Sequence, residues 1–393
     1  MEALDLLAEL RASHESRLAF EAEHAGTLLA FTEYTKPDYQ AGWFHRELAA
    51  ELDQFLADCV AGKSPRLIVE APPRHGKSEL VSRRFPAYAL GLHPSMSIIS
   101  ASYSQGLASR MNRDVQRIMD SPEYVRLFPG SRIPTRNARA ESRGKLRNSD
   151  IFELVLSDGT YRSAGVGVGI TGMGATCLLI DDPHKDAADA SSKVKRDAAW
   201  DWYTSTAYTR LAPGGGVLLV QTRWHEDDLS GRMRESSRRA EKGDDEDADV
   251  FRVVSYPAIA EKKETHRQEG DALHPERYDL AALRKIKTTL GTYYWSALYQ
   301  QSPAPSEGDV FKSSWWRYWK ALPNIVTVRI YADTALKTKE VHDWSVFQAW
   351  GRSSEDMIYL LDSIRGRWES PELKREAIDF WQKWQAQPMG AEV

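Results

Sequence analysis

The tripeptide Gly76-Lys77-Ser78 carries the clearest chemistry in this sequence, because it joins a short apolar run to a helix-like segment. Backbone N–H groups at a helix N-terminus bind phosphate oxygens, a lysine reaches the outer phosphates, and a serine hydroxyl can ligate Mg²⁺. The sequence therefore predicts a triphosphate site with Ser78 as a metal ligand. The whole candidate loop is Ala71-Pro72-Pro73-Arg74-His75-Gly76-Lys77-Ser78.

This loop is irregular, because Ala71 occupies the place of the usual first glycine. Taken alone, the tripeptide is explained equally well by an ordinary strand-to-helix turn. Arg74 could neutralise the charge that spreads over a transferred phosphoryl group, or it could position the loop through a carboxylate.

Two further strand ends carry polar side chains that suit such a site. Asp181 and Asp182 follow an apolar run, so Asp181 is expected to hold Mg²⁺ and Asp182 to act as the catalytic carboxylate. A turn-forming Asp-Asp-Pro is the better interpretation in isolation, but the phosphate loop upstream favours the functional one. Thr222 follows another buried run and could contact the terminal phosphate, or simply cap the strand.

A separate pair of carboxylates lies near the C-terminus. Asp333 ends one β-like run and Asp343 begins the next, a placement that two-metal nucleases use to hold Mg²⁺ or Mn²⁺. Taken alone, Asp333 and Asp343 are better explained as turn and cap residues.

The elements that must position these residues alternate between strand-like and helix-like segments, which predicts an α/β fold with a mostly parallel sheet. A second α/β unit is expected after a linker rich in Pro and Gly. The apolar runs of the first unit are 66–70, 96–101, 176–180, 217–221 and 250–254. Those of the second unit are 326–333, 344–350 and 357–362, followed by a helix over 371–385 and the beginning of another strand at 390.

Composition narrows the class of protein. The 393 residues suffice for two or three domains, and no stretch is apolar for long enough to span a membrane. The N-terminus lacks the pattern of a secretion signal, and Cys59 and Cys177 lack a CxxC partner, so buried structural roles are expected for them. The net charge of −4 leaves DNA contact to local patches such as the basic segment 131–147, which could equally be a solvated face.

With these residues in view, the chain resembles the large terminase subunit of tailed bacteriophages, the motor that packages DNA into a preformed capsid. The similar motifs occur in order along nearly the whole chain. They are Glu70-Ala-Pro-Pro-Arg-His-Gly-Lys-Ser-Glu79, Ser100-Ala-Ser-Tyr-Ser104, Ile180-Asp-Asp-Pro-His184, Gln221-Thr-Arg-Trp-His225, Tyr299-Gln-Gln-Ser-Pro303, Ala332-Asp-Thr-Ala335 and Asp343-Trp-Ser-Val346.

The resemblance implies a helical, adenine-contacting region over 1–45, a P-loop ATPase domain of the additional-strand type over 46–262, a linker over 263–310 and a ribonuclease H-like nuclease domain over 311–393. In that family an arginine-bearing loop without the first glycine is common. Lys77, Ser78 and Asp181 would bind ATP and Mg²⁺, Asp182 stands where many members have glutamate, and Thr222 would couple hydrolysis to movement. Trp43 and His45 would lie in the adenine-contacting stretch, and Asp333 would be the first metal ligand of the nuclease.

Partners and location follow from the same resemblance. They are double-stranded DNA, the portal protein, the small terminase subunit and further copies of the chain in a ring on the procapsid. The expected location is the bacterial cytoplasm, with no membrane contact and no secretion.

The later acids of the nuclease are expected beyond Val393, so we expect a truncated domain that does not cut DNA by itself. A cellular helicase or repair ATPase, and an inactive prophage remnant acting as a binding module, are the alternatives.

Overall fold

The computed structural model describes residues 16–17, 19–135, 144–170, 172–245, 247–303, 317–321, 324–334, 344–366, 368–384 and 390–391. The chain forms two compact units, Met1–Ser306 and Glu307–Val393. The four domain ranges inferred from the sequence stay a prediction. Among the described residues, no helix has the length and apolar character needed to cross a membrane.

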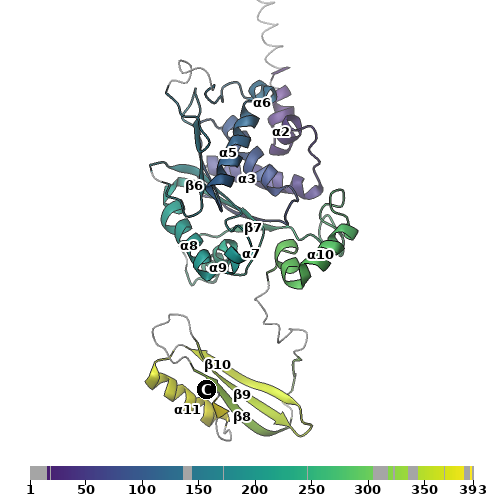
Figure 1. Ribbon diagram of the computed structural model, residues 1–393, viewed down its shortest axis with the longest axis vertical. Coiled ribbons are helices and arrows are strands. Elements are labelled where there is room, and N and C mark those ends of the chain that lie inside the picture. The colour runs from purple at the N-terminus through teal and green to yellow at the C-terminus, as the bar shows by residue number, and fades with distance from the viewer. Residues whose placement is uncertain are drawn as a thin grey trace, which may run out of the picture. The chain divides into compact units, whose positions relative to one another are not determined.

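The first unit, coloured purple to green in Figure 1, is built on a sheet. This sheet has seven strands in the order β3-β4-β2-β5-β6-β1-β7. Every neighbouring pair is parallel except β3 and β4. The strands are β1 (Arg66–Glu70), β2 (Ser97–Ser102), β3 (Ile151–Glu153), β4 (Thr160–Gly165), β5 (Ala175–Asp181), β6 (Leu211–Gln221) and β7 (Arg252–Ser255).

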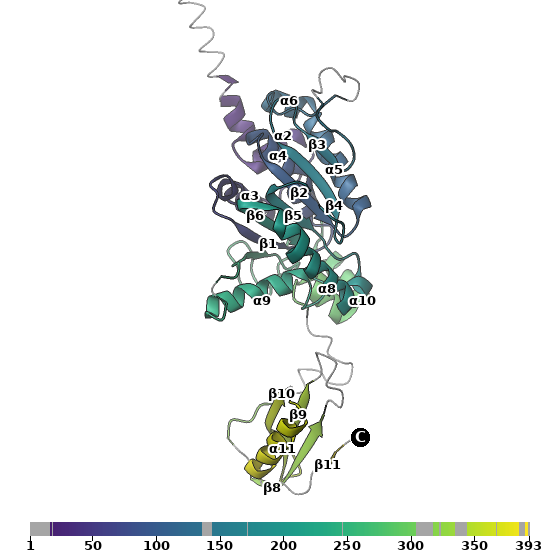
Figure 2. The same ribbon diagram turned by 90° about the vertical axis from the view of Figure 1, so that its left-hand side faces the viewer.

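Helices cover both faces of this sheet (Figure 2). Leu67 and Val69 pack on one face while Ile68 packs on the other, because successive side chains of a strand alternate. The first face is covered by α2 (Leu28–Thr35), α3 (Trp43–Val60), α4 (Phe85–Leu92), α5 (Gln105–Met119) and α6 (Pro122–Leu127). The second is covered by α8 (Lys193–Trp202), η2 (Tyr203–Ala207) and α9 (Leu229–Lys242).

Five further helical elements described by the structure belong to this unit. They are η1 (Glu79–Arg84), α7 (Ala187–Ser191), η3 (Tyr208–Arg210), α10 (Leu280–Tyr294) and η4 (Trp295–Tyr299). A small cluster of its own, which includes Leu283 and Trp295, fixes α10 and η4.

The strand order decides which loops meet. Strand β6 lies between β1 and β5, and the three are parallel, so their carboxyl ends lie at one edge of the sheet. The phosphate loop after β1, the Asp181-Asp182 pair at the end of β5 and Thr222 after β6 therefore begin from adjacent strands. Ligands of open α/β sheets bind at this edge.

The second unit has a four-stranded sheet with the order β10-β9-β8-β11. Strands β8, β9 and β10 are antiparallel, and β11 pairs in parallel with β8. Ile330, Phe347 and Ala349 pack with Phe380 from the helix. The elements are β8 (Ile325–Asp333), β9 (Ser345–Ser353), β10 (Ile358–Gly366), α11 (Ser370–Trp384) and β11 (Gly390–Ala391).

The predicted fold class, a mostly parallel α/β sheet followed by a smaller α/β unit, is confirmed. Cys59 and Cys177 are buried and free, as expected. The sequence analysis missed β3 and β4, because β4 mixes apolar residues with Thr160 and Arg162 and shows no continuous apolar run.

Candidate functional site

The phosphate loop turns sharply between β1 and the next helix. Arg74 and Gly76 have left-handed backbone angles, with φ of 61° and 95°. The carbonyl oxygen of Gly76 accepts hydrogen bonds from the N–H groups of Glu79 (3.1 Å) and Leu80 (3.3 Å), which starts the helical segment. A Cβ atom at residue 76 would lie 2.8 Å from Nε2 of His45, so both the backbone and the space require glycine there.

His45, a buried residue of α3, holds this loop through a hydrogen bond. Its Nδ1 accepts the N–H of Gly42 at 3.0 Å, so Nε2 carries the proton and donates to the carbonyl oxygen of His75 at 2.8 Å. Burial lowers the pKa of His45 to about 3 and that of His75 to about 4, which keeps both rings neutral. The described hydrogen bonds of His45 are with Gly42 and with the loop, so its predicted contact with adenine stays a prediction.

Lys77 connects the three strand ends. Its ammonium, on a side chain only 6% exposed, lies 3.1 Å from Oδ1 of Asp182 and donates to the hydroxyl of Thr222. The Thr222 hydroxyl donates to the carbonyl oxygen of Ala71 at 3.1 Å, and its N–H donates to Oδ1 of Asp182 at 2.8 Å. Lys77, Asp182 and Thr222, selected separately from the sequence, are thus brought into direct contact.

Asp181 is fully buried beside the loop. Its Oδ1 accepts the hydroxyl of Ser78 at 3.3 Å, and its Oδ2 accepts the hydroxyl of Ser82 at 2.6 Å. Burial, with the nearby charge of Asp182, raises the pKa of Asp181 to about 6. Sequence reasoning missed Ser82, although its position one helical turn after Ser78 places both hydroxyls on one side of the helix. A set of oxygen donors of this kind fits Mg²⁺.

A pocket of about 1190 Å³ opens above these residues. Pro73, Arg74, Gly76, Lys77 and Ser78 line it, whereas Ala71, Pro72 and His75 are buried beneath. Its basic side chains outnumber its acidic ones, which favours a polyanionic ligand. The basic residues are Lys36, Arg74, Lys77, Arg83, Arg110, Lys185 and Arg277, and the acidic ones are Asp38, Glu79, Asp182 and Glu276.

The stretch expected to contact adenine is divided between two pockets. Tyr39, Gln40 and His45 line the large pocket. Trp43 instead lines a neighbouring pocket of about 650 Å³, where its ring is stacked on His266 with 5.0 Å between ring centroids.

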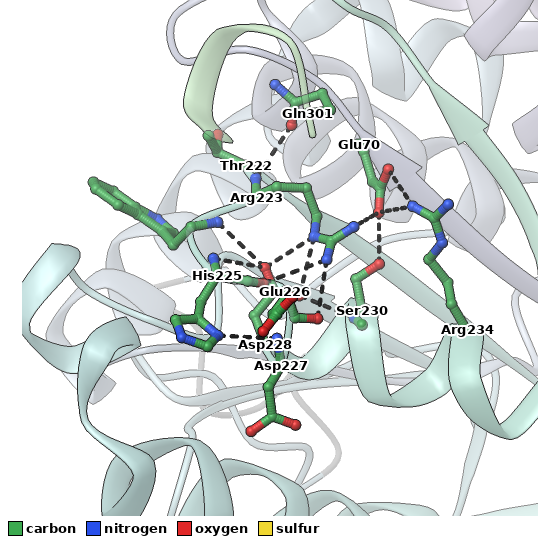
Figure 3. Close-up of polar contacts among 12 residues, drawn as sticks. Glu70, Thr222, Arg223, His225, Glu226, Asp227, Asp228, Ser230, Arg234 and Gln301 are labelled. Carbon is green, nitrogen blue, oxygen red and sulfur yellow. Dashed lines mark hydrogen bonds and ion pairs between the residues drawn. The ribbon is translucent and has the colours of Figure 1, made fainter. Parts of the chain in front are cut away.

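A buried network of charges lies directly behind Thr222 (Figure 3). The Arg223 guanidinium contacts Glu70 at 3.0 Å and Asp228 at 2.9 Å, and both carboxylates are fully buried. Glu70 also accepts a hydrogen bond from the hydroxyl of Ser230 at 2.6 Å, and it forms an ion pair with Arg234 at 3.2 Å. Nothing in the sequence pattern singled out this network, since its residues come from three separate segments.

The second pair of predicted carboxylates is only half described. Asp333 lies exposed at the end of β8, and Asp343 lies outside the described residues. Within the described part of the chain, no group of three or more His, Cys, Asp or Glu residues is placed to hold a metal ion.

The basic segment is also partly outside the described residues, since these omit Arg136, Arg139 and Arg143. In the described part, Arg147 pairs with Asp120.

Comparison with known families gives one match, over residues 68–317, to the family described as terminase large subunit, T4likevirus-type, N-terminal. A search of the curated proteins found no match.

Several solved structures are similar to this chain. The large terminase of bacteriophage HK97 is 12% identical, with 94% of this chain and 74% of that chain covered and a TM-score of 0.43. The large terminase of a thermophilic bacteriophage in complex with ADP is 10% identical, with coverages of 87% and 76% and a TM-score of 0.36. The large terminase ATPase domain of Thermus phage P74-26 is 13% identical, with coverages of 63% and 94% and a TM-score of 0.34.

Proposed function

Because this chain belongs to the family of T4likevirus-type terminase large subunits, we propose that it drives double-stranded DNA into a viral procapsid by hydrolysing ATP. Membership of the family supports a role in phage DNA packaging. The observation that carries the ATPase proposal is the contact of Lys77 with both Asp182 and Thr222 at the floor of a basic pocket.

The loop supplies the binding groups for the triphosphate. The Lys77 ammonium forms an ion pair with Asp182; a bound phosphate would take over this contact and free the carboxylate. Ser78 and Asp181 would hold Mg²⁺, which neutralises phosphate charge when it is bound. Arg74, exposed at the pocket wall, would add positive charge at the transferred group.

Asp182 is the proposed catalytic carboxylate. Its backbone has a left-handed φ of 44°, and its Oδ1 lies between the Lys77 ammonium and the Thr222 N–H. Once a phosphate occupies Lys77, this carboxylate can accept a hydrogen bond from the attacking water. Thr222 would respond to loss of the terminal phosphate through its hydroxyl contact with Lys77.

The adenine base would lie on the side of the pocket formed by Tyr39 and Gln40. The Gln40 amide can both donate to and accept from the edge of an adenine, as glutamine does in nucleic-acid recognition. His45 would support the phosphate loop below the base. Trp43, in the neighbouring pocket, keeps an indirect role in this proposal.

The second unit is proposed to be a ribonuclease H-like, metal-dependent endonuclease. In support, Asp333 ends β8, which lies inside the four-stranded sheet rather than at its edge. Asp343 is the second proposed ligand, for Mg²⁺ or Mn²⁺. That the chain alone does not cut DNA stays a prediction; plasmid cleavage by the purified chain that disappears in Asp333→Ala would contradict it while supporting the role of Asp333.

The proposed partners are the DNA duplex, the portal, the small terminase subunit and other copies of the chain in a ring, at the procapsid in the host cytoplasm. Contacts with the DNA backbone are expected to be independent of sequence and sensitive to salt. A helicase would unwind a forked duplex, so strand separation without movement along blunt duplex DNA would favour the cellular alternative.

ATP hydrolysis by the purified protein tests the central proposal. Lys77→Ala should abolish both binding and turnover, whereas Asp182→Asn should retain binding of a slowly hydrolysed ATP analogue and lose turnover. Absence of turnover in the wild-type protein, with analogue binding unaffected by Lys77→Ala, would support the inactive remnant instead.

A further inference from the structure

Gln301, near the end of the first unit, has a backbone and an environment unusual for glutamine. Its φ is 55°, in the left-handed region, although it is not glycine. Its side chain is almost completely buried, with 4% exposure. A left-handed conformation of this kind costs free energy and persists where surrounding contacts enforce it, so those contacts indicate what the strain serves.

The Gln301 amide is engaged at both ends. Its Nε2 donates to the carbonyl oxygen of Leu298 at 2.5 Å, which fixes the side chain on the preceding helical turn. Its Oε1 accepts the backbone N–H of Arg223 at 3.2 Å. Figure 3 shows this side chain directed at the segment just after Thr222. The end of the first unit is therefore joined to the carboxyl end of β6.

The two peptides on either side of Thr222 are each held by a side chain from another segment. Asp182 accepts the N–H of Thr222, and Gln301 accepts the next N–H along the chain. The Arg223 guanidinium cannot shift easily, because it is locked between buried Glu70 and Asp228. Among the described residues, Gln301 is the one uncharged side chain from another segment that bonds to the backbone of this strand end, and its removal leaves no buried charge unpaired.

We infer that Gln301 is a positioning residue for Thr222 in the nucleotide site, an inference that rests on the proposed ATPase function. The Thr222 hydroxyl contacts Lys77, so its placement depends on the peptide that Gln301 holds. Small displacements of groups around a reacting centre reduce turnover more than binding. The nucleotide site therefore extends to the segment that leads toward the second unit.

The test uses the full-length chain and three substitutions. Gln301→Met keeps the shape but cannot accept a hydrogen bond, whereas Gln301→Glu keeps the acceptor oxygen and loses the donor. Gln300→Ala is the matched control, because Gln300 belongs to the same segment but bonds to Ile259 and Glu261. Steady-state ATP turnover and thermal unfolding are measured for each variant.

We expect Gln301→Met to lower kcat by roughly ten-fold with little change in KM. Gln300→Ala should remain close to the wild-type protein, and Gln301→Glu should keep a higher kcat than Gln301→Met because its oxygen still accepts the Arg223 N–H. Wild-type kcat in Gln301→Met, or equal impairment of the Met and Glu variants, would overturn the inference. The second outcome would mean that the residue merely stabilises the fold.

Amide hydrogen exchange at Arg223 separates failure of this inference from failure of the proposed function. Faster exchange in Gln301→Met than in Gln300→Ala is expected, because only the former leaves the Arg223 N–H without its acceptor. If the wild-type protein shows no ATP turnover, the ATPase proposal fails, and unchanged exchange at Arg223 would independently remove the contact on which this inference depends.

Discussion

At the scale of single residues, the site combines two neighbouring carboxylates with different surroundings. Asp181 is fully buried and accepts two serine hydroxyls, whereas Asp182 is partly exposed to the pocket and contacts Lys77. The buried carboxylate, held by two serine hydroxyls, suits the proposed metal ligand, and the partly exposed one suits the proposed catalytic carboxylate.

The raised pKa of Asp181 predicts a pH-dependent cost of folding in the absence of metal. Its pKa is about 6 in the folded protein against an ordinary 3.8, so the folded state binds the proton more tightly. Its contribution to stability is therefore lost as pH rises from about 4 through 6. The free energy of unfolding of Asp181→Asn, relative to that of the wild-type protein, should therefore rise by on the order of 2–3 kcal/mol between pH 4 and pH 7.5.

Urea unfolding in EDTA at pH 4, 5, 6 and 7.5 measures this difference for the two proteins. Comparing the two cancels the titration of the groups that do not interact with residue 181. A stability difference that is constant across these pH values would show that Asp181 has an ordinary pKa in the folded chain.

Ser82 is expected to orient Asp181 for metal binding. Its hydroxyl occupies Oδ2 of Asp181, which leaves Oδ1 on the side of Ser78. Ser82→Ala should raise the Mg²⁺ concentration needed for half-maximal ATP turnover by about ten-fold, as is usual when a ligand loses its supporting hydrogen bond. Ser82→Thr, which keeps the hydroxyl, is the control, and an unchanged Mg²⁺ requirement in Ser82→Ala would refute the role.

At the scale of elements, the site depends on how closely helices pack on the sheet. The π-helix η1 directly follows the phosphate loop; η2 and η4 are π-helical too, and such turns are often found at functional sites. Strand β6 packs closely against α3. A Cβ atom at Gly216 would lie 2.4 Å from Sγ of Cys59 and 2.7 Å from Cζ of Phe55.

Gly216→Ala should therefore destabilise the protein by about 1–3 kcal/mol through overpacking between β6 and α3. Gly106→Ala is the matched substitution, because nothing lies within 4 Å of its Cβ position in α5, and it should be neutral or stabilising by up to about 1 kcal/mol. Urea denaturation of both variants measures the contrast. Equal stabilities would mean that α3 can move away from the sheet at little cost.

At the scale of the whole molecule, the residues of the proposed nucleotide site all belong to the unit Met1–Ser306. That unit has its own hydrophobic clusters on both faces of its sheet. The second unit has a separate cluster around Phe347 and Phe380. Nucleotide binding and the proposed DNA cleavage are thus assigned to different units.

A fragment comprising residues 1–306 should bind a slowly hydrolysed ATP analogue as the full chain does. A ligand at a hundred times its Kd stabilises the folded state by about 2.7 kcal/mol, so the analogue with Mg²⁺ should raise the Tm of both proteins. Lys77→Ala in the fragment should remove the increase. A shift seen in the full chain and absent from a folded fragment would place part of the nucleotide site in the second unit.

The sequence by itself predicted the phosphate loop, the Asp181-Asp182 pair, Thr222, the family and five of the seven strands of the larger sheet. These features are local, since an apolar run followed by a polar turn can be recognised without knowing what lies beside it. Strands β3 and β4 were not predicted, because they lie toward one edge of the sheet and mix polar with apolar residues.

Only the tertiary structure decided which of these residues touch and what holds them. Ser82 and Asp181 are 99 positions apart, and Glu70 and Arg223 are 153 apart, so no local pattern relates them. They meet because β6 enters the sheet between β1 and β5, which places three parallel strand ends side by side. The same arrangement directs Gln301 to the Arg223 peptide, since a buried hydrogen-bond acceptor is chosen by proximity in space and not by position in the chain.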